Sequence, residues 1–326
     1  MIPVGILGTG SAVPEKVLTN EDMSKLVDTN DEWIRTRTGI RERRISDENT
    51  ASSDLAIAAA KQAMDAAGVS AEEIDLIICA TVTPDYMFPA TACLVQDSIG
   101  AKKAAAFDLS AGCSGFLYGL STAVPMIQTG MYQKALVIGV ESLSKITDFE
   151  DRSTCVLFGD GAGAVVIGPT SEGKGFLSFE MGADGSGGKL LIQEAGGSRN
   201  PATQETVLAR KHFISMAGNE VFKFAVRILG TASEAALAKA GYTKEDIDYL
   251  IPHQANTRII DSAIKRLDLS PEKVYINLDR YGNMSSASIP VALDEVVRAG
   301  KLKDNDLLVL VGFGAGLTWG ATVLRW

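Results

Sequence analysis

Cys113 is the residue of this sequence whose type and surroundings best suit covalent chemistry. It lies in the segment Ala-Gly-Cys-Ser-Gly-Phe at 111–116, after a predicted strand and in the first turn of a predicted helix. Backbone N–H groups and the dipole at a helix start stabilise a thiolate, and small neighbours let a substrate approach. A free cysteine is also commonly a small buried apolar residue, as we expect for Cys79, Cys93 and Cys155. Position alone leaves both roles open for Cys113.

The elements that would hold this cysteine occur twice in the chain. The segment 67–78 returns as 240–251, a shift of 173 residues, and each copy is typical of a helix end, a short capped turn and a buried strand. Alternating strands and helices favour an α/β fold whose sheets are covered by helices. Two halves, expected at 1–172 and 173–326, would pair around a pseudo-twofold axis as a five-layer α/β/α/β/α body. We expect 182–201 to be a long excursion, because the repeat resumes after it.

The repeat also brings two polar residues towards Cys113. The segment before Cys113 matches the segment before Asn283, so pseudo-symmetry would place the two helix starts side by side. His253 comes directly after the second copy's buried strand, and α/β folds gather functional groups at strand ends. A lone histidine is more often structural, and His212 has the weaker case of the two. We therefore expect Cys113, His253 and Asn283 to share one site.

The composition argues against several other classes of protein. The 326 residues carry a formal net charge of -9, whereas general nucleic-acid binding needs a basic surface. We find no charged leader and no apolar run of about 18 residues, so we expect a cytoplasmic protein with no membrane partner. The four cysteines have no CxxC spacing and the two histidines lie far apart, so we expect neither disulfides nor a metal site.

Two glycine-rich segments are candidates for a nucleotide site. The segment 8–13 lacks the third glycine of the dinucleotide-binding fingerprint, and 159–163 lacks the Gly-Lys-Ser/Thr of a phosphate-binding loop. We interpret both as close-packed turns.

Four motifs together resemble a known family. They are Ala-Gly-Cys-Ser-Gly-Phe at 111–116, Pro-His-Gln-Ala-Asn at 252–256, Tyr-Gly-Asn-Met-Ser-Ser-Ala-Ser at 281–288 and Gly-Phe-Gly-Ala-Gly-Leu-Thr-Trp-Gly at 312–320. In this order and spacing they are similar to the β-ketoacyl-acyl-carrier-protein synthase III family, and the similarity spans nearly the whole chain. The resemblance implies the thiolase fold, a homodimer, and no cofactor, since CoA thioesters are substrates. It also implies a triad of Cys113, His253 and Asn283.

The resemblance implies a decarboxylative condensation in two half-reactions. Cys113, as a thiolate generated mainly by the helix start, would take a short acyl group such as acetyl from acyl-CoA. The backbone N–H groups of Cys113 and Ala315 would hold the oxyanion; Ala315 stands where the family often has glycine, which leaves this donor in place. Malonyl-acyl-carrier protein would then lose CO2, and its enolate, stabilised by Asn283 and a neutral His253, would attack the acyl group. The β-ketoacyl product would initiate fatty acid synthesis.

Further residues match family positions. Those expected to bind CoA are Trp33, Arg37, Arg152, Gly218, Phe222 and Asn256. Those expected at the acyl pocket are Leu143 and, reaching across the dimer, Phe88. Those expected to dock an acidic carrier protein are Lys223, Arg258, Lys265 and Arg266. The last three lie on the polar stripe of a predicted helix, where an ordinary solvated face would look the same.

Other activities stay open at this point. A papain-like hydrolase also combines Cys, His and Asn, although its Cys-Gly-Ser-Cys-Trp type of signature is missing. Within the thiolase fold, the alternatives are an acyltransferase of secondary metabolism and a hydroxymethylglutaryl-CoA synthase-like enzyme, which would need an additional glutamate. A non-catalytic acyl-binding protein would have no need for all three groups of the triad.

Overall fold

Two β-sheets organise the computed structural model, which describes residues 2–326. The first sheet has the order β1-β7-β6-β4-β5 and the second the order β11-β12-β13-β8. The strands of the first are β1 (Val4–Ala12), β4 (Leu76–Ala80), β5 (Ala105–Leu109), β6 (Ala135–Glu141) and β7 (Gly161–Pro169). Those of the second are β8 (Gly175–Ala183), β11 (Tyr249–Pro252), β12 (Leu307–Gly314) and β13 (Thr318–Arg325). The boundary proposed at residue 172 falls between β7 and β8 and stays a prediction.

Strand directions are mixed in both sheets. In the first, β4 runs parallel to β5 and β6, and β7 runs antiparallel to β1 and β6. In the second, β11 runs parallel to β12, and β13 runs antiparallel to β12 and β8. The carboxyl ends of β4, β5 and β6 therefore share one edge of the first sheet.

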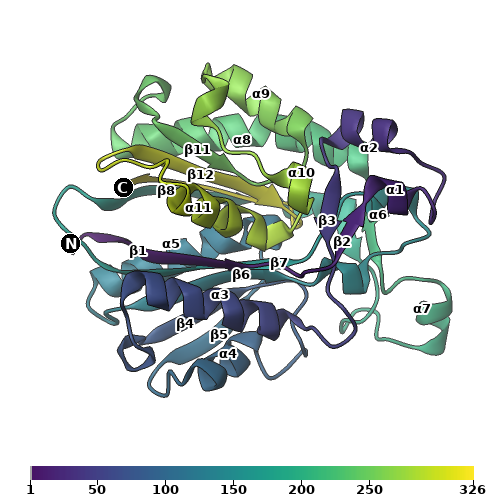
Figure 1. Cartoon of the computed structure of the whole chain (residues 1–326), viewed down its shortest axis with the longest axis horizontal. Coiled ribbons are helices and arrows are strands. Elements are labelled where there is room, and N and C mark those ends of the chain that lie inside the picture. The colour runs from purple at the N-terminus through teal and green to yellow at the C-terminus, as the bar shows by residue number, and fades with distance from the viewer. Residues whose placement is uncertain (1) are drawn as a thin grey trace.

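Helices cover the outer faces of both sheets and fill the space between them (Figure 1). The helices α3 (Ser52–Ala67) and α4 (Thr91–Ile99) form one outer layer. Between the sheets lie α5 (Gly115–Gln128) and α11 (Ser288–Arg298). The other outer layer contains α8 (Gly218–Ala240) and α9 (Thr257–Leu267). This arrangement confirms the expected five layers.

Shorter elements connect this framework. They are β2 (Val17–Thr19), α1 (Asn20–Met23), α2 (Asp31–Thr38), β3 (Glu42–Arg44), α6 (Arg152–Cys155), β9 (Leu191–Gln193), α7 (Gln204–Leu208), β10 (Ile214–Met216) and α10 (Leu278–Tyr281). The excursion expected at 182–201 begins two residues inside β8 and contains β9, whose partner strand β10 lies beyond residue 201. The excursion therefore runs on through α7 to Met216, further than expected. Within residues 2–326, no helix combines the length and apolarity that a membrane span requires.

The strands at the centre of each sheet are apolar along their length because helices cover both faces. Every residue of β4, β6 and β12 is buried, as is typical of sheets between helical layers. Glu141, at the carboxyl end of β6, is the one charged residue of these strands and has no exposed surface. A buried carboxylate at a strand end needs compensating hydrogen bonds.

The repeat correctly pairs the two central helices but not their first residues. A 3-10 turn over Gly112–Ser114 precedes α5, and one over Ser285–Ala287 precedes α11. The structural counterpart of Cys113 is therefore Ser286, and Asn283 lies before the turn, so the pairing of Cys113 with Asn283 is wrong in register. The cause is that β5 has no full counterpart: the second half forms only an isolated bridge between Leu250 and Val274.

The two glycine-rich segments lie mainly in strands, so their interpretation as turns is wrong. Gly8 and Gly10 belong to β1, and Gly161 and Gly163 to β7. The close packing is real: a Cβ on Gly10 would lie 2.3 Å from the carbonyl oxygen of Ala59 in α3. These glycines let helices approach the sheet backbone directly.

We expect Gly10→Ala to lower the free energy of unfolding by about 1–3 kcal/mol, because the added methyl group must push α3 away from β1. The matched control is Gly197→Ala, since a Cβ at Gly197 meets nothing within 4 Å; we expect it to stay within about 0.5 kcal/mol of the parent. Denaturant unfolding followed by circular dichroism measures both. Equal losses in the two variants would contradict the backbone contact between β1 and α3.

Candidate active site

One cavity joins the three residues singled out in the sequence. Cys113 lies in the turn before α5, His253 follows β11, and Asn283 follows α10. All three line a cavity of about 90 Å³. Their exposed fractions are 7%, 1% and 9%, so the centre is nearly closed to bulk water.

A second cavity of about 150 Å³ lies against Cys113. Its apolar lining includes Leu143, which is 2% exposed, together with Val82, Ile146, Phe158, Leu191 and Ile214. Ser285 and Ala315 also line it. Cys113 therefore stands between two pockets, of which this one is mostly apolar.

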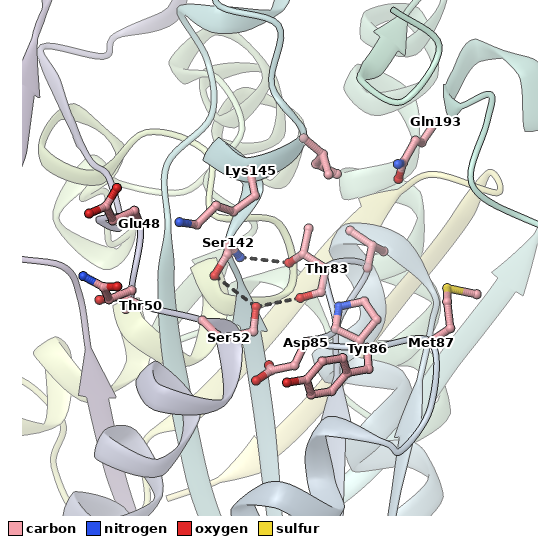
Figure 2. Close-up of a pocket in the computed structure, with 15 residues that line it drawn as sticks. Glu48, Thr50, Ser52, Thr83, Asp85, Tyr86, Met87, Ser142, Lys145 and Gln193 are labelled. Carbon is pink, nitrogen blue, oxygen red and sulfur yellow. Dashed lines mark hydrogen bonds between the residues drawn. The ribbon is translucent and has the colours of Figure 1, made fainter. Parts of the chain in front are cut away.

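A larger, open cavity of about 510 Å³ adjoins the second one and shares Val82, Ile146 and Gln193 with it. Figure 2 shows Ser52, Thr83 and Ser142 joined by hydrogen bonds along its wall, with Tyr86 and Met87 at its side. The neighbouring Phe88 is not among the lining residues and is 86% exposed. In one copy of the chain, Phe88 therefore stays outside the pocket.

The end of β12 lies directly against the turn that carries Cys113. A Cβ on Gly314 would lie 2.3 Å from the backbone nitrogen of Cys113, and one on Gly112 would lie 2.6 Å from that of Ala315. Gly112 also has a φ of 56°, which favours glycine. These glycines bring together the two backbone segments that carry the expected oxyanion donors.

Burial favours the protonated form of the Cys113 thiol. Burial raises its pKa to about 12, and a hydrogen bond from the Ser285 side chain opposes this rise. A helix start supplies at most about 2 kcal/mol, which is roughly 1.5 pKa units. Burial therefore opposes the thiolate that the helix start is expected to favour, so a nearby proton acceptor would assist its formation. That the helix start is the main source of the thiolate stays a prediction.

His253 has a neutral ring whose orientation is fixed. Burial lowers its pKa to about 3, so the imidazole stays uncharged at physiological pH. The Oγ atom of Ser288 lies 2.6 Å from Nδ1 and accepts a 3.4 Å hydrogen bond from the backbone N–H of Gln254. The hydroxyl of Ser288 can donate to Nδ1, and in that arrangement the ring proton is on Nε2, which is the tautomer that we assign.

The amide of Asn283 is oriented by its neighbour Ser285. The backbone N–H of Ser285 donates a 2.8 Å hydrogen bond to Oδ1 of Asn283, which leaves Nδ2 free to donate elsewhere. Ser285 has a φ of 46°, an unusual value for a residue other than glycine. Its hydroxyl donates to Glu141 at 2.9 Å, which helps to hold this conformation.

Sequence reasoning missed Glu141, Ser285 and Ser288. Two signals could have found them. Glu141 ends an otherwise apolar strand, and the serines belong to the polar run Ser-Ser-Ala-Ser at 285–288 beside Asn283.

The residues expected to bind CoA fall into two groups. Gly218, Phe222 and Asn256 line the 90 Å³ cavity together with the three central residues. At the surface, the guanidinium groups of Arg37 and Arg152 lie 4.8 and 5.1 Å from the centre of the Trp33 ring. Asn256 links the groups, because its Nδ2 donates to the backbone oxygen of Arg37 at 2.9 Å.

The four basic residues of the expected docking surface are all exposed, on α8 and α9. Arg258 stacks over the ring of Phe222 at 5.1 Å, next to the cavity. Arg266 makes two hydrogen bonds to Glu234, at 3.1 and 2.7 Å, so its charge is already paired. Lys223 and Lys265 complete the set. In the part of the chain that the structure describes, no cluster of three or more His, Cys, Asp or Glu could hold a metal ion.

Five layers of duplicated α/β structure, with a cysteine at the start of a central helix, define the thiolase fold. Comparison with known proteins refines this assignment. Residues 107–185 match the family model of 3-oxoacyl-[acyl-carrier-protein] synthase III, and residues 237–326 match that of its C-terminal part. The chain belongs to this family, for which β-ketoacyl-acyl-carrier-protein synthase III is the equivalent name.

Relatives and solved structures agree. The chain is 60% identical over 326 residues to a β-ketoacyl-[acyl-carrier-protein] synthase III of Desulfitobacterium hafniense, covering 100% of this chain and 98% of the relative. It is 62% identical over 324 residues to that of Symbiobacterium thermophilum, covering 99% and 98%. The crystal structure of the synthase III from Thermus thermophilus superposes with a TM-score of 0.92 at 50% identity, covering 99% of each chain.

We expect His253 to remain neutral, with its proton on Nε2, from about pH 8 down to about pH 5, because its pKa is about 3. Nitrogen-15 NMR of labelled histidine measures this directly, since the chain has only two histidines. In Ser288→Ala the two tautomers should mix. The control is Ser233→Ala. Ser233 is a buried serine on α8 whose hydroxyl donates to the backbone oxygen of Leu229, and its loss should leave the spectrum of His253 unchanged. A charged His253 at about pH 6 would contradict this assignment.

Proposed function

We propose that this chain initiates fatty acid synthesis by joining a short acyl-CoA, with acetyl-CoA as the expected starter, to malonyl-acyl-carrier protein. The products are β-ketoacyl-acyl-carrier protein, CoA and CO2. The chain is thus an acyltransferase, as the names of its relatives indicate. The structural observation that carries the proposal is the place of Cys113 between an apolar pocket and a cavity lined by His253 and Asn283.

In the first half-reaction, the Cys113 sulfur attacks the thioester carbon of acyl-CoA, and CoA leaves as a thiolate. The N–H groups of Cys113 and Ala315 stabilise the oxyanion of the tetrahedral intermediate. The acyl chain then lies in the pocket beside Leu143. The volume of about 150 Å³ supports a short starter.

In the second half-reaction, malonyl-acyl-carrier protein loses CO2 beside His253 and Asn283. Nε2–H of His253 and Nδ2–H of Asn283 donate hydrogen bonds to the thioester oxygen as the enolate charge develops. The enolate carbon attacks the acyl group, and the Cys113 sulfur leaves. A neutral histidine suits this role, because it can donate its Nε2 proton in a hydrogen bond without titrating near neutral pH.

The CoA part of the substrate extends from this centre to the surface. Gly218, Phe222 and Asn256 surround its pantetheine arm. Trp33 stacks on the adenine, and Arg37 and Arg152 bind the phosphates through charge. CoA thioesters are substrates in this scheme, and we propose no resident cofactor. We also propose a cytoplasmic location, without nucleic-acid or membrane partners.

A second copy of the chain would complete the acyl pocket. Tyr86, Met87 and Phe88 are 60%, 80% and 86% exposed, and such a run of exposed apolar side chains favours an interface. The open cavity of about 510 Å³ adjoins the acyl pocket and offers an entry. We therefore propose a homodimer in which each Phe88 caps the pocket of the partner.

The formation of an acyl-enzyme tests the function. Intact mass after incubation with acetyl-CoA should show one acetyl adduct, which malonyl-acyl-carrier protein discharges into a β-ketoacyl product. The adduct should be absent in Cys113→Ala and retained in Cys93→Ala, which removes an exposed free cysteine. Absence of an adduct with every short acyl-CoA would refute the proposal, and discharge by water alone would indicate a hydrolase instead.

Charge reversal tests carrier-protein docking. We expect Lys265→Glu to lower kcat/KM for malonyl-acyl-carrier protein by about threefold to tenfold at low salt, and by less at high salt, because exposed charges are screened. Acylation by acetyl-CoA should not change. The control is Lys61→Glu, which reverses an exposed charge on α3 in the opposite outer layer. Equal effects of the two variants would place docking elsewhere.

A further inference from the structure

A buried carboxylate with no part in the mechanism above lies behind Cys113. Glu141 has no exposed surface at the end of β6. Its Oε2 accepts hydrogen bonds from the Thr83 hydroxyl at 2.7 Å and the Val82 backbone N–H at 3.1 Å. Its Oε1 accepts from the hydroxyls of Ser285 and Ser286, each at 2.9 Å. Such convergent donors are typical of an ionised carboxylate.

Ser285 connects this carboxylate to the nucleophile. Cys113 and Ser285 line the same 150 Å³ cavity, and a hydrogen bond from the Ser285 side chain favours the Cys113 thiolate. The same hydroxyl lies 2.9 Å from Oε1 of Glu141. A hydroxyl accepts from one group while it donates to another. The Ser285 hydroxyl can therefore accept from the thiol while donating to Glu141, and reverse both bonds after the proton moves.

The electrostatics of the site favour transfer of the thiol proton to a group that is already negatively charged, because this adds no charge to the buried region. Burial raises the pKa of Glu141, so its carboxylate is a stronger base than an exposed glutamate. Moving the thiol proton to this carboxylate leaves one negative charge in the buried region, whereas loss of the proton to water would leave two.

The other titratable groups near Cys113 and Glu141 are poor acceptors. Burial lowers the pKa of His253 to about 3, and its Nδ1 lies 2.6 Å from the Ser288 hydroxyl, so this ring is a weak base. Cys79 on β4 is fully buried, and burial together with nearby carboxylates raises its pKa well above the usual value. The pKa of Glu141 is raised by burial, and the neutral hydrogen-bond donors around it oppose that rise.

We propose that Glu141 takes the Cys113 thiol proton through Ser285 and holds it while the acyl-enzyme exists, an inference that rests on the proposed function. As the S–H bond breaks, the thiol proton passes to Oγ of Ser285, whose own proton passes to Oε1. The thiolate attacks the acyl carbon, and the departing CoA thiolate takes a proton from solvent. When the enolate attack breaks the C–S bond, the sulfur leaves as a thiolate and recovers its proton by the reverse path. The proton that the CoA thiolate takes is therefore the only proton that each turnover consumes from solvent.

Alkylation by iodoacetamide tests the relay without the natural substrate. The rate constant for Cys113 alkylation is measured by mass spectrometry against pH in a Cys93→Ala background, for Glu141→Gln, Ser285→Ala and Ser286→Ala. We expect the first two to react at least about 100-fold more slowly near neutral pH, with rates that rise about tenfold per pH unit. Ser286→Ala is the matched control, because Ser286 binds the same oxygen of Glu141 without lining the cavity; it should stay within about threefold of the parent.

The comparison distinguishes the relay from a structural role. Equal slowing by Ser285→Ala and Ser286→Ala with an unchanged pH profile would overturn the relay. Ser285→Ala keeps the backbone N–H that binds Asn283, so it decides the matter even if Glu141→Gln does not fold.

Acetylation by acetyl-CoA in the same variants separates this inference from the proposed function. If the parent is acetylated normally and the pH profiles of alkylation in Glu141→Gln and Ser285→Ala match that of the parent, the relay is refuted. The proposed function is then unaffected. If the alkylation profiles are as expected but acetyl-CoA does not acetylate the parent, the relay is supported and the proposed condensing function is refuted.

Discussion

The burial of the residues at the centre between the two sheets is the constraint on which the site depends. Burial favours the uncharged form of each titratable group, and here it acts on a thiol, an imidazole and a carboxyl. A neutral His253 is useful as a hydrogen-bond donor, whereas a neutral thiol is a poor nucleophile. The same environment therefore serves one half-reaction directly and requires a proton acceptor for the other.

The fold creates this buried centre by bringing backbone segments unusually close. A Cβ on Gly139 of β6 would lie 2.2 Å from the backbone oxygen of Ser286, and one on Gly314 of β12 would lie 2.3 Å from the nitrogen of Cys113. Each sheet thus presses a glycine against the turn that leads into a central helix. With so little space, hydrogen bonds within the protein must replace water, as the donors around Glu141 do.

The sequence predicted the fold and the main members of the site because both leave periodic or compositional signals. The repeated segments at 67 and 240 indicated two similar halves, and the polar residues after buried strands indicated Cys113 and His253. The register of Asn283 could not be predicted, because the second half has no complete counterpart of β5. The chain before α11 therefore does not match the chain before α5 residue by residue. Glu141 and Ser288 were missed since their roles depend on contacts between residues far apart in the chain. The pKa of Cys113 depends on burial, which no local motif reports.

The hydrogen bonds around Ser285 suggest why a residue in an unfavourable backbone conformation stands at the centre. Its N–H orients the amide of Asn283, which acts on the enolate in the proposed mechanism. Its hydroxyl donates to Glu141 and, in the proposed relay, joins that carboxylate to the Cys113 thiol. A glycine would adopt the φ of 46° more readily but would lose the hydroxyl. The strain, on the order of 1 kcal/mol, is offset by bonds that also hold both polar groups in place. In this scheme one negative charge moves from Glu141 to the sulfur and then to the oxyanion, and leaves with the CoA thiolate. The malonyl carboxylate brings in the next charge, which passes from the enolate through the sulfur back to Glu141. The site then needs to stabilise only one charge at a time, which is the least costly arrangement for a buried site.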